Sequence, residues 1–277
     1  MTEPFVLENE QTLSLHKWKK LQPNLVVGFT TKNGGISEGH YNTLNMGLHV
    51  KDSQDAVYQN KKTVAELLNM PTENWVGCDQ THEDNIVKVD ESYKGKGVFS
   101  YDTALTGTDG IYTDREDILL TLCFADCVPL YFFAPDHSIV GIAHAGWKGT
   151  VKNIAGKMIK LWKSEGIKED SILVAIGPSI SAEAYVVDHF VVNKVKDVLP
   201  TINQDKYMKE VSEGQFALDL KRVNYELLVQ AGVKDENILS SSFCTSRADS
   251  LFFSHRRDKG NTGRMMSFIG LKGANRK

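Results

Sequence analysis

Two side chains with metal-binding chemistry, Cys127 and His144, flank a stretch that reads as a pair of β-strands. Residues 128–133 and 139–143 are rich in β-branched and aromatic side chains, and residues 134–137 have turn composition. If the strands form an antiparallel hairpin, the entrance of the first lies beside the exit of the second. Cys127 stands at that entrance and His144 at that exit. The pattern therefore predicts that they are neighbours in space.

A metal site needs at least one more ligand, and the chain offers eight histidines in all. No two of them are arranged as His-x-His or His-x-x-x-His, so any site must be assembled from distant segments. His82, in a loop directly before a strand, is the best-placed third partner. One thiolate and two imidazoles suit a tetrahedral zinc ion whose fourth position stays open, as in catalytic sites. A zinc ion in such a site lowers the pKa of bound water to near ~7.

Two residues close to Cys127 each have two interpretations. Asp126 either orients a metal ligand as a neighbouring carboxylate or caps the turn. Cys123 would share a face with Cys127 along one extended strand, but a buried apolar role is the safer interpretation.

Positive charge is concentrated in residues 244–264, among glycine, hydroxyl and aromatic side chains. Because guanidinium groups bind phosphate bidentately, this stretch is a candidate anion clamp, with ion-paired turns as an equally good alternative. Its cations are Arg247, Arg256, Arg257, Lys259 and Arg264. A glycine-rich loop after residue 29 adds Lys32, Asn45 and His49, and loops of this length are often functional.

Composition limits the class of protein. The 277 residues are 41% hydrophobic and 24% charged with a net charge of -3, which describes an ordinary globular protein without electrostatic reason to bind nucleic acid or an anionic membrane. No apolar run approaches the ~20 residues of a membrane span, and the N-terminus lacks a signal-peptide core. Four sparse cysteines fit a reducing compartment. We expect a cytoplasmic protein and, from its size alone, a monomer.

Strand and helix patterns intermix along the whole chain, and no linker or repeat divides it. We therefore predict one α/β domain (residues 1–277) with mixed sheets. The predicted helices cover residues 55–70, 150–165, 190–199 and 216–231. The predicted strands include residues 25–29, 86–89, 172–176, 238–243, 251–254 and 265–269.

Several of these motifs together resemble the YlmD/YfiH family, over residues 25–270, which leaves residues 1–24 as an N-terminal lead-in segment. The family was long labelled a laccase-domain or polyphenol oxidoreductase family. Its members are described as zinc-dependent purine nucleoside phosphorylases with adenosine deaminase and methylthioadenosine phosphorylase activity. The matching motifs include Gln80-Thr81-His82, Ala125-Asp126-Cys127-Val128-Pro129, His144-Ala145-Gly146-Trp147-Lys148-Gly149 and Thr262-Gly263-Arg264-Met265.

The resemblance implies an α/β (α+β) fold, a single-domain layered sandwich of mixed β-sheets flanked by helices. It also implies that His82, Cys127 and His144 bind zinc. Phosphate is then expected to attack the ribose anomeric carbon of adenosine, inosine, guanosine or S-methyl-5'-thioadenosine. Candidates for binding substrate and phosphate are Lys32, Asn45, Arg247, Arg256 and Arg257. For the deaminase reaction, Asp126 or Glu83 could shuttle protons, and the sequence does not choose between them.

Two other classes of protein remain as alternatives. A copper-dependent polyphenol oxidase would need several copper centres, commonly with His-x-His pairs, which this chain lacks. A non-catalytic metal-binding protein is the other alternative, and a three-ligand site with an open position argues against it.

Overall fold

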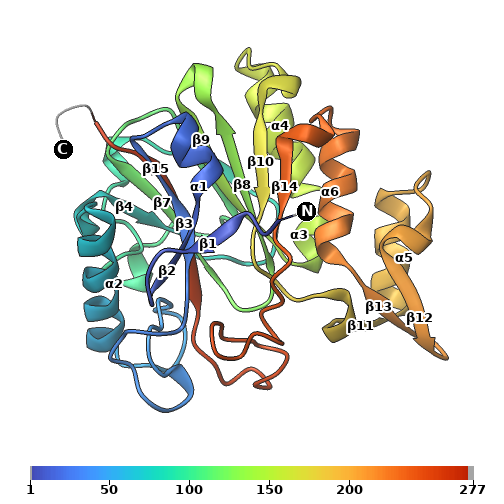
Figure 1. Cartoon of the computed structure of the whole chain (residues 1–277), viewed down its shortest axis with the longest axis horizontal. Helices are drawn as coiled ribbons and strands as arrows, with labels where there is room; N and C mark the ends of the chain where they lie inside the picture. The colour runs from blue at the N-terminus through green and yellow to red at the C-terminus, as the bar shows by residue number, and fades with distance from the viewer. Residues whose placement is uncertain (1, 274–277) are drawn as a thin grey trace.

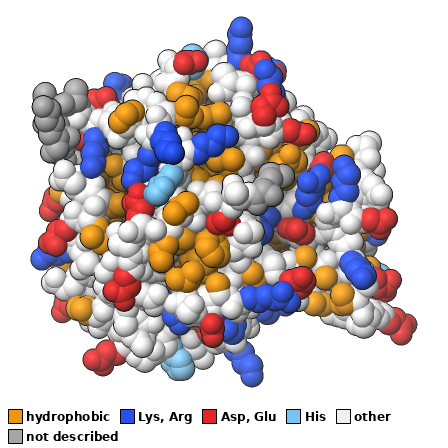
Figure 2. All heavy atoms as spheres, in the orientation of Figure 1, with side chains coloured by type: hydrophobic (Ala, Val, Ile, Leu, Met, Phe, Trp, Pro, Cys, Tyr) orange, Lys and Arg blue, Asp and Glu red, His pale blue; other side chains and the backbone are white. Residues whose placement is uncertain are grey.

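Two six-stranded sheets packed face to face form the body of the molecule in the computed structural model, which describes residues 2–273. Helices cover the outer face of each sheet, so four layers follow one another: helix, sheet, sheet, helix (Figure 1). This arrangement confirms the predicted sandwich of mixed sheets in one domain. Charged side chains of both signs are scattered over the face drawn in Figure 2.

The first sheet joins the two ends of the described chain. Its central strand β15 lies between β3 and β7 and pairs antiparallel with both. The residues expected to form a lead-in add two strands and a helix, and Phe5 and Trp18 are buried in the core. In spatial order the strands are β1 (Phe5–Leu7), β2 (Thr12–Leu15), β3 (Leu25–Thr30), β15 (Met265–Leu271), β7 (Ile118–Phe124) and β4 (Trp75–Gly77).

The second sheet contains the predicted hairpin. Its two strands pair antiparallel, with Val128 opposite Ala145 and Pro129 opposite His144, so the prediction for this pair is confirmed. In spatial order the strands are β14 (Ile238–Ser240), β10 (Leu173–Ile176), β8 (Val128–Ala134), β9 (Ile139–Ala145), β6 (Gly110–Thr113) and β5 (Ile86–Lys88).

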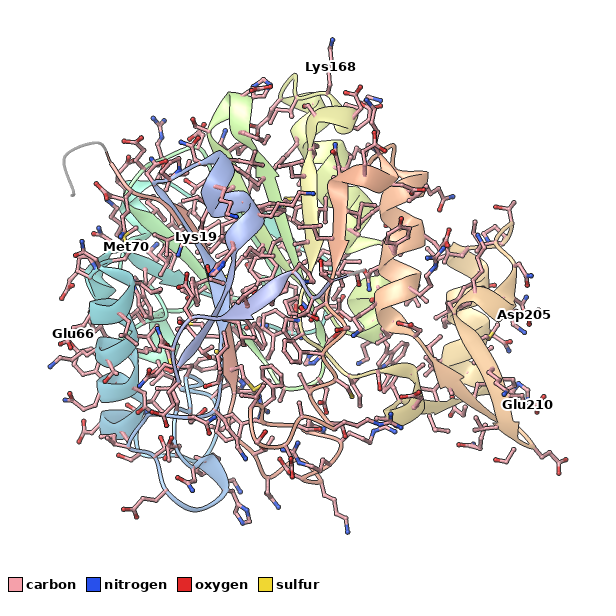
Figure 3. All side chains as sticks on the ribbon, viewed as in Figure 1. Lys19, Glu66, Met70, Lys168, Asp205 and Glu210 are labelled. Atoms are coloured by element: carbon pink, nitrogen blue, oxygen red, sulfur yellow. The ribbon has the colours of Figure 1, made fainter. Side chains whose placement is uncertain are left out.

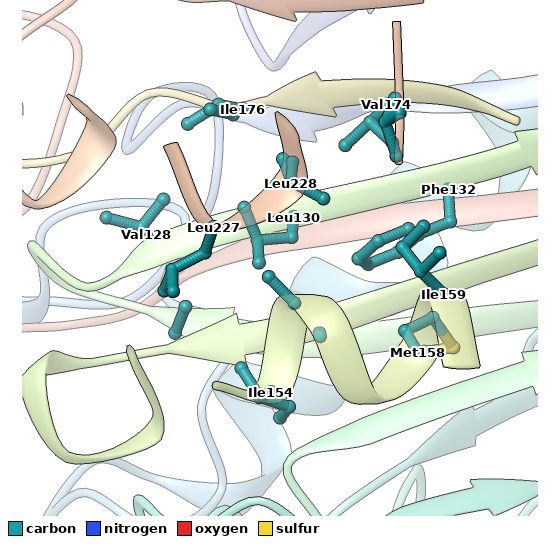
Figure 4. Packing of buried hydrophobic residues seen from close by; sticks show 14 of the residues in the cluster. Val128, Leu130, Phe132, Ile154, Met158, Ile159, Val174, Ile176, Leu227 and Leu228 are labelled. Carbon is teal, nitrogen blue, oxygen red and sulfur yellow. The ribbon is translucent and has the colours of Figure 1, made fainter. Parts of the chain in front are cut away.

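Alternating side chains of these strands build separate apolar layers. In β8, Tyr131 and Phe133 face the first sheet, whereas Leu130 and Phe132 face the helices on the other side. Such alternation is what a sheet buried on both faces requires. Figure 4 shows the helix-facing layer, with Val128, Leu130 and Phe132 close to Ile154, Met158 and Ile159.

The helices and a small third sheet complete the fold. Helix α2 packs on the first sheet, and Glu66 projects from it toward solvent (Figure 3). The third sheet and α5 stand to one side of the sandwich (Figure 1). The helices are α1 (His16–Leu21), α2 (Gln54–Leu68), α3 (Trp147–Val151), α4 (Ile154–Ser164), α5 (His189–Val198) and α6 (Leu220–Gln230). The third sheet contains β11 (Val186–Asp188), β13 (Gln215–Leu218) and β12 (Met208–Ser212).

Three predicted elements differ from the structure. The helix expected over residues 150–165 is two helices, because Asn153 adopts a left-handed conformation (φ 59°) and its side chain caps α4. The helix expected from Phe216 begins only after Asp219, whose carboxylate accepts from the Arg222 N–H, and Phe216 lies on β13. Residues 251–254 form no strand, since Leu251 ends a turn and residues 252–254 are irregular.

No helix within residues 2–273 combines the length and the apolar character that crossing a membrane would require.

Candidate metal centre and cavity

Three predicted ligands converge from separate parts of the fold. His82 lies in the loop between β4 and β5, Cys127 in the loop between β7 and β8, and His144 on β9. One ligand atom from each lies within 4.8 Å of the others, and this is the one such His, Cys, Asp and Glu cluster in residues 2–273. His144 is buried, Cys127 is half-buried and His82 is exposed, so the cluster opens on the His82 side.

The backbone around the cluster is shaped to let the ligands meet. His82 has a positive φ of 61° and Asp126 one of 87°, a conformation that residues with a side chain adopt at an energetic cost. A Cβ at Gly146 would lie 3.1 Å from both the Cys127 Sγ and the His82 Cδ2. Glycine at this position therefore leaves room for the two ligands beside the start of α3.

A buried carboxylate, Asp109, connects two of the ligands. His144 Nδ1 donates to Asp109 Oδ1 over 2.7 Å, which leaves Nε2 free to face the cluster. The same carboxylate accepts from the backbone N–H groups of His82 (3.1 Å) and Glu83 (2.8 Å). Asp109 thus fixes the ring of one histidine and the loop that carries the other, as carboxylates behind metal-binding histidines do.

Electrostatics favour the deprotonated, metal-binding form of the thiol. Burial raises the pKa of Cys127, but the charge of His144 and hydrogen bonds from His144 and His82 outweigh it and lower the pKa to about 6. Burial lowers the pKa of His144, whereas the Cys127 thiolate and Asp109 raise it to about 9. The pair is a thiolate with an imidazolium, and a cation that replaces the imidazolium proton would keep the charge balance.

The cluster forms part of the wall of a cavity of about 280 Å³, near the lower end of the ~300–1,000 Å³ of small-molecule sites. Arg256 lies over the ring of Tyr185, 5.0 Å from its centroid. Arg264, the residue directly before β15, also lines the cavity. The lining residues are His49, Gln80, His82, Tyr101, Cys123, Ala125, Asp126, Cys127, His144, Ile180, Tyr185, His255, Arg256 and Arg264.

The two carboxylates predicted to transfer protons lie in different places. Asp126 lines the cavity, and its oxygens accept from the hydroxyls of Thr245 and Ser254 and from the Arg256 N–H. Glu83 lies outside the cavity lining and forms an ion pair with Lys152 on the surface. Of the two, Asp126 is therefore the one within reach of a bound ligand.

Of the five residues predicted to bind substrate or phosphate, the cavity lining includes Arg256 alone. Lys32 lines a separate surface depression. Arg247 is exposed and pairs with Glu183 (2.6 Å), and Arg257 pairs with Asp258 and donates to backbone carbonyls. The fifth, Asn45, is fully buried, and its side chain bonds to Asp52 and to backbone groups of Gly47 and Arg264.

Cys123 does not share a strand with Cys127. β7 ends at Phe124 in the first sheet, β8 begins at Val128 in the second, and Cys127 lies in the connection between the sheets. Cys123 nevertheless reaches the cavity from the first sheet, where Gln80 holds its backbone through both amide atoms (2.7 and 2.9 Å).

Sequence reasoning missed several residues around the cavity. Asp109 lies just before β6. A carboxylate at the start of a strand, followed by glycine, is the sequence feature that could have identified it. Arg264 was noted in the basic stretch without being separated from its neighbours. His255 lies in the same basic stretch, beside Arg256. Tyr101 and Tyr185 carried no signal, because separate loops bring them to the cavity.

The fold and the cavity define a four-layer sandwich protein with a candidate mononuclear metal site. The family model described as "Multi-copper polyphenol oxidoreductase laccase" matches residues 26–272. Nearly the whole chain also matches proteins named YlmD and structures named YfiH and YlmD. The chain belongs to this YlmD/YfiH family.

Individual relatives cover the chain almost completely. A protein of Bacillus subtilis (strain 168) named "Purine nucleoside phosphorylase YlmD" is 46% identical over 275 residues, 98% of each chain. The protein of that name from Geobacillus stearothermophilus is 50% identical over 248 residues, 89% of this chain and 90% of the relative. The crystal structure of Bacillus licheniformis hypothetical protein YfiH matches with a TM-score of 0.94 and 50% identity, covering 98% of this chain and all of that one. The oxidoreductase description and the phosphorylase names disagree about the chemistry.

Proposed function

We propose that this protein is a zinc-dependent purine nucleoside phosphorylase. Its substrates are adenosine, inosine, guanosine and S-methyl-5'-thioadenosine, its products the free base and ribose or methylthioribose 1-phosphate, and adenosine deamination is a side activity. The observation that carries the proposal is a single cavity that joins the three-ligand cluster to two arginines, Arg256 and Arg264. The phosphorylase names of relatives at 46% and 50% identity agree with it.

The donor set supports zinc over copper. One thiolate and two imidazoles suit both metals, but the copper sites with these donors add a weak axial methionine or glutamine. No methionine is among the described residues that line the cavity, and both amide atoms of Gln80 are bonded to the backbone of Cys123. A zinc ion held by His82, Cys127 and His144 would supply a Lewis acid and a bound water of lowered pKa.

Different residues of the cavity would bind the purine and the phosphate. Ile180 and Tyr185 offer apolar surface against which a purine ring can lie. The arginines supply the positive charge that a phosphate dianion needs, and fixed cations stabilise the charge that develops during its transfer. Asp126 is the carboxylate that we assign to proton transfer in deamination, because it lines the cavity and Glu83 does not.

Chromatography of zinc-quantified protein incubated with inosine, with and without phosphate, tests the proposal. We expect hypoxanthine and ribose 1-phosphate to form with phosphate and to be lost in His82→Ala. His137→Ala is the matched control, since His137 lies in the turn at the other end of the β8–β9 hairpin from His144. If base release does not depend on phosphate, the protein is not a phosphorylase.

The family description makes phenol oxidation the second candidate. Oxygen uptake with a phenolic substrate, measured on copper-loaded and zinc-loaded protein, separates the two activities. Copper-dependent oxygen uptake that Cys127→Ala abolishes, without any nucleoside turnover, would favour the oxidase.

A further inference from the structure

Arg264 differs from most arginines of the structure in lacking a carboxylate partner. Within residues 2–273 it shares this property with Arg256 alone, and both line the cavity. The paired arginines are Arg115 with Asp114, Arg222 with Glu226, Arg247 with Glu183 and Arg257 with Asp258. Arg264 is half-buried, and Cys127 and Asp126 attract it without forming an ion pair with it. A guanidinium that lines a cavity without an ion-pair partner is favourably placed to bind an anionic ligand.

The guanidinium of Arg264 is held in one orientation. Its Nη1 donates to the backbone carbonyls of Thr262 (2.8 Å) and Gly263 (3.0 Å). Its Nε and Nη2 donate to no atom of the residues that the structure describes. These two groups form one edge of the guanidinium, the edge that binds two oxygens of an oxyanion at once.

The backbone of Arg264 is fixed on both sides. Its N–H donates to Asn45 Oδ1 (2.8 Å), and its carbonyl accepts from the Met46 N–H (3.0 Å). A Cβ at Gly47 would lie 2.8 Å from the Arg264 Cγ and 3.3 Å from the His49 Cε1. Glycine there lets both side chains pack against the loop, and Asn45 acts as a positioning residue for Arg264.

His49 supplies a second donor next to Arg264. Its ring packs on Tyr101 with 5.7 Å between the centroids, and it has no hydrogen-bond partner among residues 2–273. His49 is exposed to solvent, but partial desolvation of its ring first, and the charges of Arg264 and His144 next, lower its pKa to about 4, so the imidazole is neutral at pH 7. A neutral imidazole donates one hydrogen bond and adds no charge beside the arginine.

We propose that Arg264, with His49, forms the subsite that binds the attacking phosphate, an assignment that rests on the proposed phosphorylase function. Arg256 is the weaker candidate, because its guanidinium already lies on Tyr185 and donates to the Val186 carbonyl. In the reaction an oxygen of hydrogen phosphate bonds to the anomeric carbon, and the bond from that carbon to the purine nitrogen breaks. The electron pair of that bond leaves on the purine, which takes the proton of the hydrogen phosphate.

Arg264→Gln tests the subsite through two measurements on zinc-loaded protein. We expect the KM for phosphate in inosine phosphorolysis to rise roughly ten- to hundred-fold, because one charged bidentate contact is lost. The KM for inosine should change less than about three-fold. Calorimetric titration with inorganic phosphate alone should show the same weakening of Kd, and Arg264→Lys should fall between wild type and Arg264→Gln.

Arg115→Gln is the matched control. Arg115 is exposed, pairs with Asp114, and follows the end of β6 that is remote from Asp109. This variant should keep the wild-type Kd for phosphate. Zinc content and the thermal midpoint of each variant show whether the fold and the metal site are intact.

The two proposals fail in different ways. If wild-type protein releases no base but binds phosphate in an Arg264-dependent manner, the phosphorylase function is wrong and the anion subsite stands. If Arg264→Gln keeps the wild-type Kd and KM for phosphate while Arg256→Gln loses them, the subsite lies at Arg256 and the present assignment is overturned.

Discussion

Asp109 is the residue on which the geometry of the metal centre depends most. It is completely buried, and its two oxygens receive the ring N–H of His144 and backbone N–H groups of the loop that carries His82. An asparagine has the same shape but only one acceptor oxygen, and its NH2 group would face backbone donors. Replacing Asp109 by asparagine should therefore disturb the positions of both His82 and His144.

For Asp109→Asn we predict a ten- to hundred-fold loss of zinc affinity, in the range of about 1.4–2.8 kcal/mol. Competition with a chromophoric zinc chelator measures the affinity directly. Circular dichroism of the variant with and without zinc reports whether the fold survives. An unchanged zinc affinity in a folded variant would show that His144 does not depend on this carboxylate.

The chemistry of the residues predicted part of the candidate site. Whether a residue could be predicted depended on how far away in the sequence its partners lie. Cys127 and His144 could be paired from the sequence because a hairpin is local and its register follows from the turn. Asp109 and Arg264 could not be placed, because each acts through contacts with a segment far away in the sequence. Glu83 was a candidate from its position beside His82, but its side chain turns outward to Lys152.

Among the elements, the break between α3 and α4 separates the helix at the metal centre from the helix in the core. Asn153 makes this break: its φ of 59° is left-handed, and its Oδ1 accepts from the Gly156 N–H (2.9 Å). Asparagine tolerates this conformation better than most residues and is a favourable N-cap. The apolar spacing continues across the break, from Val151 in α3 to Ile154 and Met158 in α4, so periodicity alone predicts one helix.

We predict that Asn153→Ala lowers the free energy of unfolding by roughly 1–3 kcal/mol, through loss of the cap and strain at a positive φ. Asn153→Gly is the matched variant, because glycine accepts the conformation and costs only a few tenths of a kcal/mol as a cap. Urea unfolding followed by tryptophan fluorescence measures both. Equal losses in the two variants would mean that the left-handed conformation is not the main cost.

At the scale of the whole molecule, the pH dependence of stability includes a contribution from a lysine buried between α2 and the first sheet. Lys61 is 6% exposed, and its Nζ donates to the Val98 carbonyl (2.9 Å). Burial lowers the pKa of Lys61 to about 8, against an opposing effect of Cys123. In the unfolded chain the pKa returns to 10.5.

The sign of the pH dependence follows from these two values. Between pH 8 and pH 10.5 the unfolded chain holds a proton that the folded protein has released, so this group adds stability as the pH rises. We predict that the wild type gains about 2 kcal/mol relative to Lys61→Met between about pH 7.5 and about pH 9.5. Lys62→Met, at the exposed neighbour, is the control and should follow the wild type. Parallel curves for all three proteins in urea unfolding would contradict the prediction.

The layered sandwich was predictable as a class, but its strand order was not. Alternating apolar patterns indicate that strands are buried, and they leave open which strands pair. β1 and β2 join this sheet through β3, whereas the insertion of β15 between β3 and β7 depends on contacts between segments far apart in the sequence. Local patterns contain no information on such pairings.

The central position of β15 also sets the order of events during synthesis. While the ribosome has yet to release residues 265–271, β3 and β7 each present an unpaired edge where β15 will lie, and open edges are sites of aggregation. Arg264 directly precedes this strand, so the proposed phosphate subsite is assembled in the same step. A nascent chain of this protein therefore completes the pairing of its first sheet and gains its proposed anion-binding capacity together, once residues 264–271 have left the ribosome.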